Sequence, residues 1–177
     1  MCDMKLYEEK LNKANVGDAL LSQNLKEEPY IIINDKSDFN NPCNYEIIKT
    51  NHAGGVGVIF PLDLGFTWIT SKQILPKILN DISTYLQNKN IPICGQGNDI
   101  LVNDQKLFGT MFKKLEENIF YEGLFFSFNS DVNTIKKICK KEMIKKPIGL
   151  SEFKVTPEEI IKLCQSLIKK YGLKEVE

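Results

Sequence analysis

The sequence predicts an α+β fold in which helices pack against a mixed, mostly antiparallel β-sheet. Three stretches lead to this prediction. Residues 72–89 repeat large apolar side chains at three- to four-residue spacing, which is the period of an amphipathic helix. Residues 100–112 contain two apolar runs joined by Asn-Asp, a turn sequence, and so indicate a β-hairpin. Residues 156–171 open with Thr-Pro-Glu-Glu, a helix-capping sequence, and then repeat the helical period.

Before the helix at 72–89, the patterns predict one helix and three strands. Residues 6–23 carry a loose apolar face and are expected to be helical. Residues 30–34 are continuous and β-branched, and 45–50 form a second strand-like run after a loop rich in Asp, Asn and Pro. Residues 66–69 follow an Asp-Leu-Gly sequence and are expected to be the next strand.

The second half of the chain predicts two more elements besides the hairpin and the terminal helix. For the helix at 72–89, Ser71 is expected to be the N-cap, because a hydroxyl can accept a bond from a free amide at the helix start. Residues 119–128 are strongly apolar and aromatic, and they indicate a buried strand. Residues 132–141 are expected to be a helix or part of one.

Composition limits the class of protein. The 177 residues suit one domain, and a single domain over 1–177 is expected. The formal net charge is zero, which argues against a nucleic-acid binder because such proteins need a basic surface. The lysine pairs within residues 136–146 are expected to be a solvated helix face. Alternatively, they steer an acidic protein partner.

The cysteines and the apolar runs indicate where the protein acts. The five cysteines include no Cys-x-x-Cys pair and the chain has one histidine, so no metal site is expected. The odd number of cysteines, with no secretory signal sequence, indicates a reducing compartment. No apolar run is long enough to span a bilayer, so a cytoplasmic protein without a membrane partner is expected.

Two glycine-containing stretches are candidate binding sites. The first includes Gly54, Gly55 and Gly57, and three glycines within four positions allow a backbone to approach a ligand closely. The second is the hairpin, where Lys106 stands at the start of the returning strand and Gly109 follows it. A glycine inside a strand often marks a place where another molecule approaches the backbone.

The hairpin region resembles the signature of lipoate–protein ligases. Its sequence reads Asn-Asp, three apolar residues, a short turn and then Lys-x-x-Gly, from Asn98 to Gly109. The glycine-rich loop, Asp-Leu-Gly, the long helix and the capped terminal helix follow the order of that family, over about residues 10–172. The resemblance implies the class II synthetase-like catalytic fold of the biotin and lipoate ligase superfamily. It also implies a chain without the small C-terminal accessory domain of bacterial members.

The resemblance implies an activity and a site. In the family, lipoate or octanoate reacts with MgATP to give an acyl-adenylate, which then acylates a lysine of a lipoyl-carrier domain of the E2 or H-protein type. Lys106 takes the position of the catalytic lysine, which contacts the acyl carboxylate and then the adenylate phosphate. The expected substrate- and nucleotide-binding residues are Gly54, Gly55, Gly57, Asn98, Asp99 and Gly109.

Departures from the family pattern leave alternatives open. The arginine pair before the glycine-rich loop is absent, and Val56 interrupts the loop's three consecutive glycines. Lysine does not reproduce the bidentate geometry of a guanidinium. One alternative is therefore a non-catalytic member that binds a lipoyl group or a carrier protein. A biotin ligase is a weaker one, because that family also depends on an arginine. A separate accessory protein, or only the transfer half-reaction, would explain the short chain.

Cys94 raises a further alternative. Some octanoyltransferases of this superfamily use a cysteine just before this hairpin as an acyl-thioester nucleophile. An ammonium group such as that of Lys106 can lower the pKa of a nearby thiol and so activate it. The simpler interpretation of Cys94 is an unreactive cysteine.

Overall fold

The computed structural model of the chain describes residues 4–24, 27–33, 39–49, 57–71, 73–96, 99–139 and 145–176. In chain order the elements are α1 (Met4–Lys13), β1 (Asp18–Gln23), β2 (Tyr30–Ile33), β3 (Glu46–Lys49), β4 (Gly57–Ile59), β5 (Leu64–Thr70), α2 (Leu75–Gln87), β6 (Ile93–Gln96), β7 (Asp99–Val102), β8 (Gln105–Glu116), β9 (Ile119–Phe126), α3 (Val132–Ile138), the 3-10 helix η1 (Leu150–Phe153), α4 (Pro157–Lys170) and β10 (Lys174–Glu175).

Two sheets organise the molecule. The larger has seven strands in the order β10-β1-β5-β9-β8-β7-β6, and every neighbouring pair is antiparallel except β1 with β10. The smaller has the order β3-β2-β4, with β2 and β3 parallel. The expected α+β fold with a mixed, mostly antiparallel sheet is therefore confirmed.

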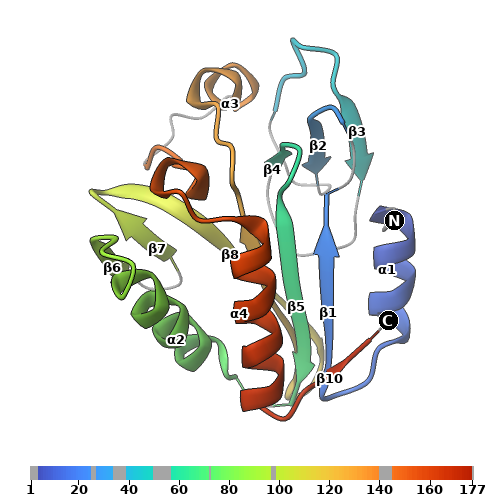
Figure 1. The fold of residues 1–177 in the computed structure, drawn as a ribbon. Helices are drawn as coiled ribbons and strands as arrows, with labels where there is room; N and C mark the ends of the chain where they lie inside the picture. The colour runs from blue at the N-terminus through green and yellow to red at the C-terminus, as the bar shows by residue number, and fades with distance from the viewer. Residues whose placement is uncertain are drawn as a thin grey trace.

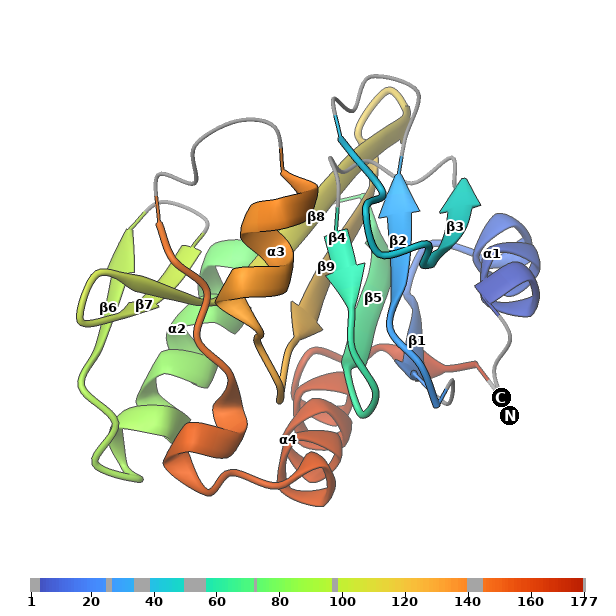
Figure 2. The ribbon, with the colours of Figure 1, turned by 90° about the horizontal axis from the view of Figure 1, so that it is seen from above.

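One face of the large sheet holds the main core. Helices α2 and α4 lie side by side on this face (Figures 1 and 2). The largest side chains buried beneath them are Phe66, Trp68 and Phe126 of β5 and β9. Cys164 of α4 is fully buried in the same cluster, and burial raises the pKa of its thiol to about 12. Removing this apolar surface from water is the main force that holds the helices on the sheet.

The other face of the large sheet carries two smaller units. The small sheet and α3 lie on this side (Figure 2), and Ile31 and Ile33 of β2 pack with Ile138 of α3 in a separate cluster. Helix α1 packs on β1, β5 and β9, where Tyr7 and Leu11 contact a second group of buried side chains. That group consists of Leu20, Ile69 and Tyr121.

Local sequence signals account for both long helices. The capping box at α4 is present: the Thr156 hydroxyl accepts from the Glu159 amide, and the Glu159 carboxylate accepts from the Thr156 amide. Helix α2 buries its apolar stripe as predicted. The predicted N-cap at Ser71 is wrong, because α2 begins at Leu75 and its N-cap is Ile74, which has no side-chain acceptor.

Glu122 of β9 replaces the missing N-cap of α2. Its Oε2 accepts hydrogen bonds from the Ile74 amide at 3.1 Å and from Nε1 of Trp68 at 2.9 Å. The side chain is 1% exposed, and burial raises its pKa despite these bonds. Oε1 has no hydrogen-bond partner among the described residues. Glu122 thus connects the start of α2 to the sheet at the cost of a buried carboxylate.

Two substitutions test this role of Glu122. We expect Glu122→Ala to lower the free energy of unfolding by about 2–3 kcal/mol, because it leaves two buried N–H donors unpaired. Glu122→Gln keeps an acceptor and removes the buried charge, so a change below about 1 kcal/mol is expected. Urea denaturation of the three proteins measures both values. Equal losses in the two variants would show that the charge of Glu122, rather than its acceptor oxygen, stabilises the fold.

The N-terminal prediction is wrong in its second half. Residues 6–23 were expected to be one helix, but α1 ends at Lys13 and residues 18–23 form β1. Gly17, with a φ of 94°, lies in the turn that leads from α1 into β1, a conformation that glycine adopts readily. Ala19 and Leu20 then pair with β5 and are buried, so sheet formation outweighs local helix propensity. Strand β10, which pairs with β1, was not predicted.

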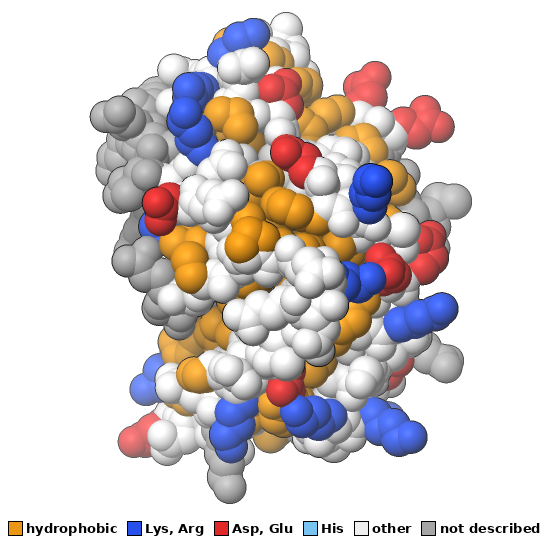
Figure 3. Space-filling view, turned by 60° about the vertical axis from the view of Figure 1, so that its left-hand side comes forward, with side chains coloured by type: hydrophobic (Ala, Val, Ile, Leu, Met, Phe, Trp, Pro, Cys, Tyr) orange, Lys and Arg blue, Asp and Glu red, His pale blue; other side chains and the backbone are white. Residues whose placement is uncertain are grey.

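The surface carries mixed charge. On the face shown in Figure 3, hydrophobic side chains gather across the centre, while lysines alternate with acidic side chains around the edge. The described residues on this face therefore form no continuous basic patch. Within the described ranges, each helix is too short or too polar to cross a membrane.

Candidate functional site

In the β7–β8 hairpin, Lys106 is the second residue of β8, the returning strand. Asn103 and Asp104 connect the strands with φ values of 47° and 61°, the left-handed conformation that a tight two-residue turn requires. Lys106 pairs with Leu101, but the next pair is Phe108 with Ile100, so Leu107 is an extra residue on β8. Such a bulge bends a strand and redirects its side chains, and bulges often lie beside active sites.

The backbone of Lys106 is fixed on its other side by a distant segment. Its amide donates to the Lys146 carbonyl at 2.8 Å, and its carbonyl accepts from the Ile148 amide at 3.0 Å. These bonds form a parallel bridge between Lys106 and Pro147. Residues 145–148 therefore lie alongside the start of β8, and the backbone of Lys106 is held by β7 on one side and by this segment on the other.

The Lys106 side chain lies over Gly109 and ends at Asp99. Its Nζ is 2.8 Å from Oδ1 of Asp99, and the two side chains are 39% and 27% exposed. A Cβ at position 109 would lie 3.7 Å from Cε of Lys106 and 3.9 Å from its Nζ. Glycine thus leaves the lysine a path along the strand, and a larger branched side chain would displace it. The ion pair is open to solvent, so a ligand can reach the ammonium group.

A second lysine reaches the same carboxylate. Nζ of Lys145 is 3.8 Å from Oδ2 of Asp99, so the two lysines lie on the two oxygens of one carboxylate. Lys145 is not among the residues expected in the site from the sequence. Its only signal was membership of the basic cluster, which was interpreted as a solvated face. The partial burial of Lys145, with 25% of its side chain exposed, distinguishes it from such a face.

The structure brings three predicted site residues together and places Gly57 in another sheet. Asp99, Lys106 and Gly109 form one group on β7 and β8. Gly57 begins β4 of the smaller sheet. Gly54, Gly55 and Asn98 lie outside the described residues. His52, which is in the same glycine-rich loop, also lies outside them.

Cys94 lies two strands away from Lys106. It pairs with Leu101 of β7, which in turn pairs with Lys106, so the three residues form one row across the sheet. The strand spacing puts the backbones of Cys94 and Lys106 about 10 Å apart. The thiol-bearing residue is exposed, and the buried Leu101 lies between it and the lysine.

Asp63 of the Asp-Leu-Gly sequence supports the fold around the site. It is fully buried, and its two oxygens accept from the amides of Phe60, at 2.7 Å, and Phe128, at 3.1 Å. These bonds join the turn before β5 to the end of β9. Burial raises its pKa to about 7, although both backbone bonds lower it. Asp63 therefore has a structural role in this protein.

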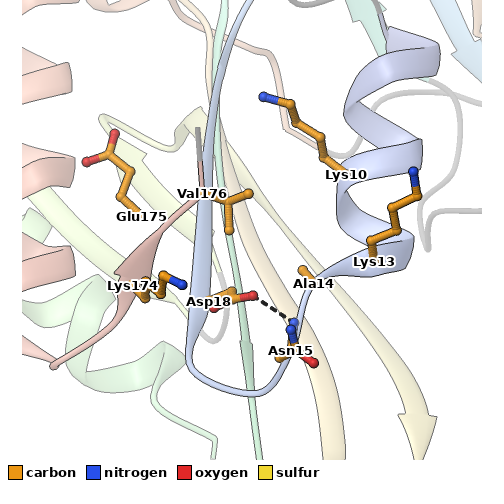
Figure 4. Close-up of a pocket in the computed structure, with 8 residues that line it drawn as sticks. All are labelled: Lys10, Lys13, Ala14, Asn15, Asp18, Lys174, Glu175 and Val176. Atoms are coloured by element: carbon orange, nitrogen blue, oxygen red, sulfur yellow. Dashed lines mark hydrogen bonds between the residues drawn. The ribbon is translucent and has the colours of Figure 1, made fainter.

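A separate pocket lies at the far edge of the large sheet. It has a volume of about 570 Å³ and lies between α1, β1 and β10 (Figure 4). Lys10 and Lys13 of α1 and Lys174 of β10 line it together with Asp18 and Glu175. Strands β5 and β9 separate this edge from β8, so the pocket is not part of the group around Lys106.

The fold of the chain was compared with those of solved structures, and its sequence with known proteins. The sequence itself matches no family model and no curated protein. The structure aligns with lipoate-protein ligase A bound with ATP at a TM-score of 0.74 and 13% identity, covering 97% of this chain and 82% of the other. The chain has the lipoate–protein ligase fold. The expectation of this fold, and of a divergent sequence, is thus confirmed.

Two further structures share the lipoate–protein ligase fold. P. falciparum LipL1 in complex with lipoate is 24% identical, with a TM-score of 0.69. The alignment covers 93% of this chain but 54% of LipL1, so the chain spans about half the length of that protein. The bi-partite lipoate protein ligase of Thermoplasma acidophilum, studied with its E2 lipoyl domain, is 13% identical, covers 97% and 80% of the two chains and has a TM-score of 0.71.

Proposed function

We propose that the protein is a lipoate–protein ligase-like acyltransferase that attaches lipoate or octanoate to a lysine of a lipoyl-carrier domain. The observation that carries the proposal is the position of Lys106. The structure fixes its backbone between β7 and residues 145–148, and its ammonium group lies beside Gly109 at a solvent-accessible ion pair. This is the lysine that the family signature selects, on the fold of that family.

The proposed reaction has two steps. In the first, the acyl carboxylate attacks the α-phosphorus of ATP, forming an acyl-adenylate and releasing pyrophosphate. In the second, the amine of the carrier lysine attacks the acyl carbon, the amide bond forms and AMP leaves. Lys106 would hold the carboxylate and then neutralise charge that develops on the departing phosphate. The fixed backbone of Lys106 keeps this ammonium group within the site during both steps.

The described side chains fit anionic substrates. Lys106 and Lys145 supply two ammonium groups near one another, and both are partly exposed. Among the described residues, no group of three or more His, Cys, Asp and Glu side chains could hold a metal ion. Mg²⁺ in nucleotide sites needs only one or two carboxylates, because the substrate phosphates supply other ligands. We therefore assign Asp99 to the metal or nucleotide end of the site.

The structural neighbours support the substrates of this proposal. One was determined with lipoate, one with ATP, and a third belongs to a system with an E2 lipoyl domain. By analogy, we propose lipoate, ATP with Mg²⁺ and a carrier domain of the E2 or H-protein type for this chain. The site at Lys106 and the proposed cytoplasmic location are compatible with these partners.

A second candidate is a binding protein without ligase activity. One observation favours it: all 23 basic residues of the chain are lysines, and the sequence contains no arginine. Arginine commonly binds phosphate through two parallel hydrogen bonds, which lysine cannot form. A protein that kept the fold but lost nucleotide activation would still bind a lipoyl group or its carrier.

An intact-mass assay separates these candidates. The purified chain is incubated with lipoate, MgATP and a lipoyl-carrier domain, and a parallel reaction contains preformed lipoyl-adenylate. We expect the mass of the carrier to increase by one lipoyl group in both reactions. An increase only with the adenylate would restrict the protein to the transfer step. An unmodified carrier in both reactions would contradict the proposal and favour the binding protein.

A further inference from the structure

We propose that Lys145 binds substrate together with Lys106, as the second cation of a two-lysine site for the negatively charged end of the substrate. The ligand is the carboxylate of the acyl substrate or the phosphate of the nucleotide, and both are oxyanions. This inference rests on the proposed function, because it extends the site at Lys106. It assigns a role to a residue that the family signature does not contain.

Asp99 holds the two ammonium groups close to each other. Oδ1 of Asp99 is 2.8 Å from Nζ of Lys106, and Oδ2 is 3.8 Å from Nζ of Lys145. Both lysines therefore converge on one side chain from different parts of the chain. Their partial exposure, 39% and 25%, leaves the pair open to a ligand from solvent.

The backbone fixes the position of Lys145 relative to Lys106. The carbonyl of Lys146, the next residue, accepts a hydrogen bond from the Lys106 amide. The Ile148 amide donates a hydrogen bond to the Lys106 carbonyl. Ile148 is buried, so the segment is anchored by packing as well as by hydrogen bonds. Lys145 is thus held next to the site by the backbone contacts of the residues that follow it.

The charges of Lys106, Lys145 and Asp99 favour the binding of an anion. Two ammonium groups converge on one carboxylate here, and cationic side chains attract negatively charged substrates. The chain has no arginine, so guanidinium contacts to substrate are replaced by contacts from other cations, chiefly lysines. Lys106 of β8 and Lys145 of the adjoining segment can contact two oxygens of one carboxylate or phosphate, a task that one guanidinium performs in other proteins.

Binding measurements on the full chain test the role of Lys145. Isothermal titration calorimetry is carried out with lipoate, with ATP, and with lipoamide, which has the same acyl group but no negative charge. The variants are Lys145→Gln and Lys136→Gln; the latter makes the same charge change at an exposed position of α3 in the basic cluster. We expect Lys145→Gln to lower the affinity for lipoate or for ATP by about three- to ten-fold, because one partly exposed charge contact is lost. Lipoamide affinity should not change.

The outcomes separate the two oxyanions and the two proposals. A loss for lipoate alone assigns Lys145 to the carboxylate, and a loss for ATP alone assigns it to the phosphate. Wild-type affinity for both anions in Lys145→Gln, or an equal loss in Lys136→Gln, overturns the inference. Lys145-dependent binding by a chain that modifies no carrier would overturn the proposed function and leave this inference standing. A wild-type chain that binds neither anion overturns both.

Discussion

Replacing Lys106 with alanine is expected to lower the rate of lipoyl transfer to a carrier domain by at least about 100-fold, the usual cost of one catalytic charge-stabilising group. The ammonium group would contact the reacting carboxylate and phosphate, whereas the rest of the substrate binds elsewhere. Binding of the uncharged acyl chain should therefore change little. The fold should also change little, because a partly exposed ion pair such as Lys106–Asp99 contributes about 1 kcal/mol or less.

A matched control separates catalysis from general charge. Lys114 lies on the same strand, exposed near its far end, so Lys114→Ala removes one lysine from β8 without touching the site. Single-turnover transfer from lipoyl-adenylate, followed by intact mass, gives the rate for each protein. Transfer by Lys106→Ala at more than about a tenth of the wild-type rate is incompatible with the proposed role. An equal loss in Lys114→Ala would indicate a general effect of charge.

The largest effect on stability is expected at Asp63. Asp63→Ala should lower the free energy of unfolding by about 3–4 kcal/mol, because it leaves the buried amides of Phe60 and Phe128 without acceptors and opens a small cavity. Asp63→Asn keeps one acceptor oxygen but directs an NH₂ group at the other amide. A loss of about 1–2 kcal/mol is therefore expected for asparagine. Urea denaturation of both variants measures these values.

The stability difference at Asp63 should depend on pH. The pKa of Asp63 is raised from 3.8 to about 7 in the folded protein, so the folded state binds a proton more tightly than the unfolded chain. This group therefore stabilises the fold most at low pH, and the contribution is lost as the pH rises through about 7. The difference between wild type and Asp63→Asn should be larger at about pH 5 than at about pH 8. A difference independent of pH would show that Asp63 is ionised throughout this range.

Local rules in the sequence predicted much of the fold. The apolar period of α2 and α4 and the capping box at Thr156 were confirmed, because helix period and capping act within a few residues. Asn103 and Asp104 predicted the hairpin for the same reason. The proximity of Asp99, Lys106 and Gly109 also follows from the sequence, since a tight hairpin brings residues on its two strands together.

Tertiary structure alone decided what depends on residues far apart in the chain. Local patterns could not show that residues 18–23 would pair with β5 as a strand, or that Glu122 would cap α2. They also could not show that Lys145 would reach Asp99, because that contact depends on the bridge between Lys106 and Pro147. Helix period and turn chemistry are properties of neighbouring residues. Strand pairing and the meeting of charges across a sheet are set by packing of the whole chain.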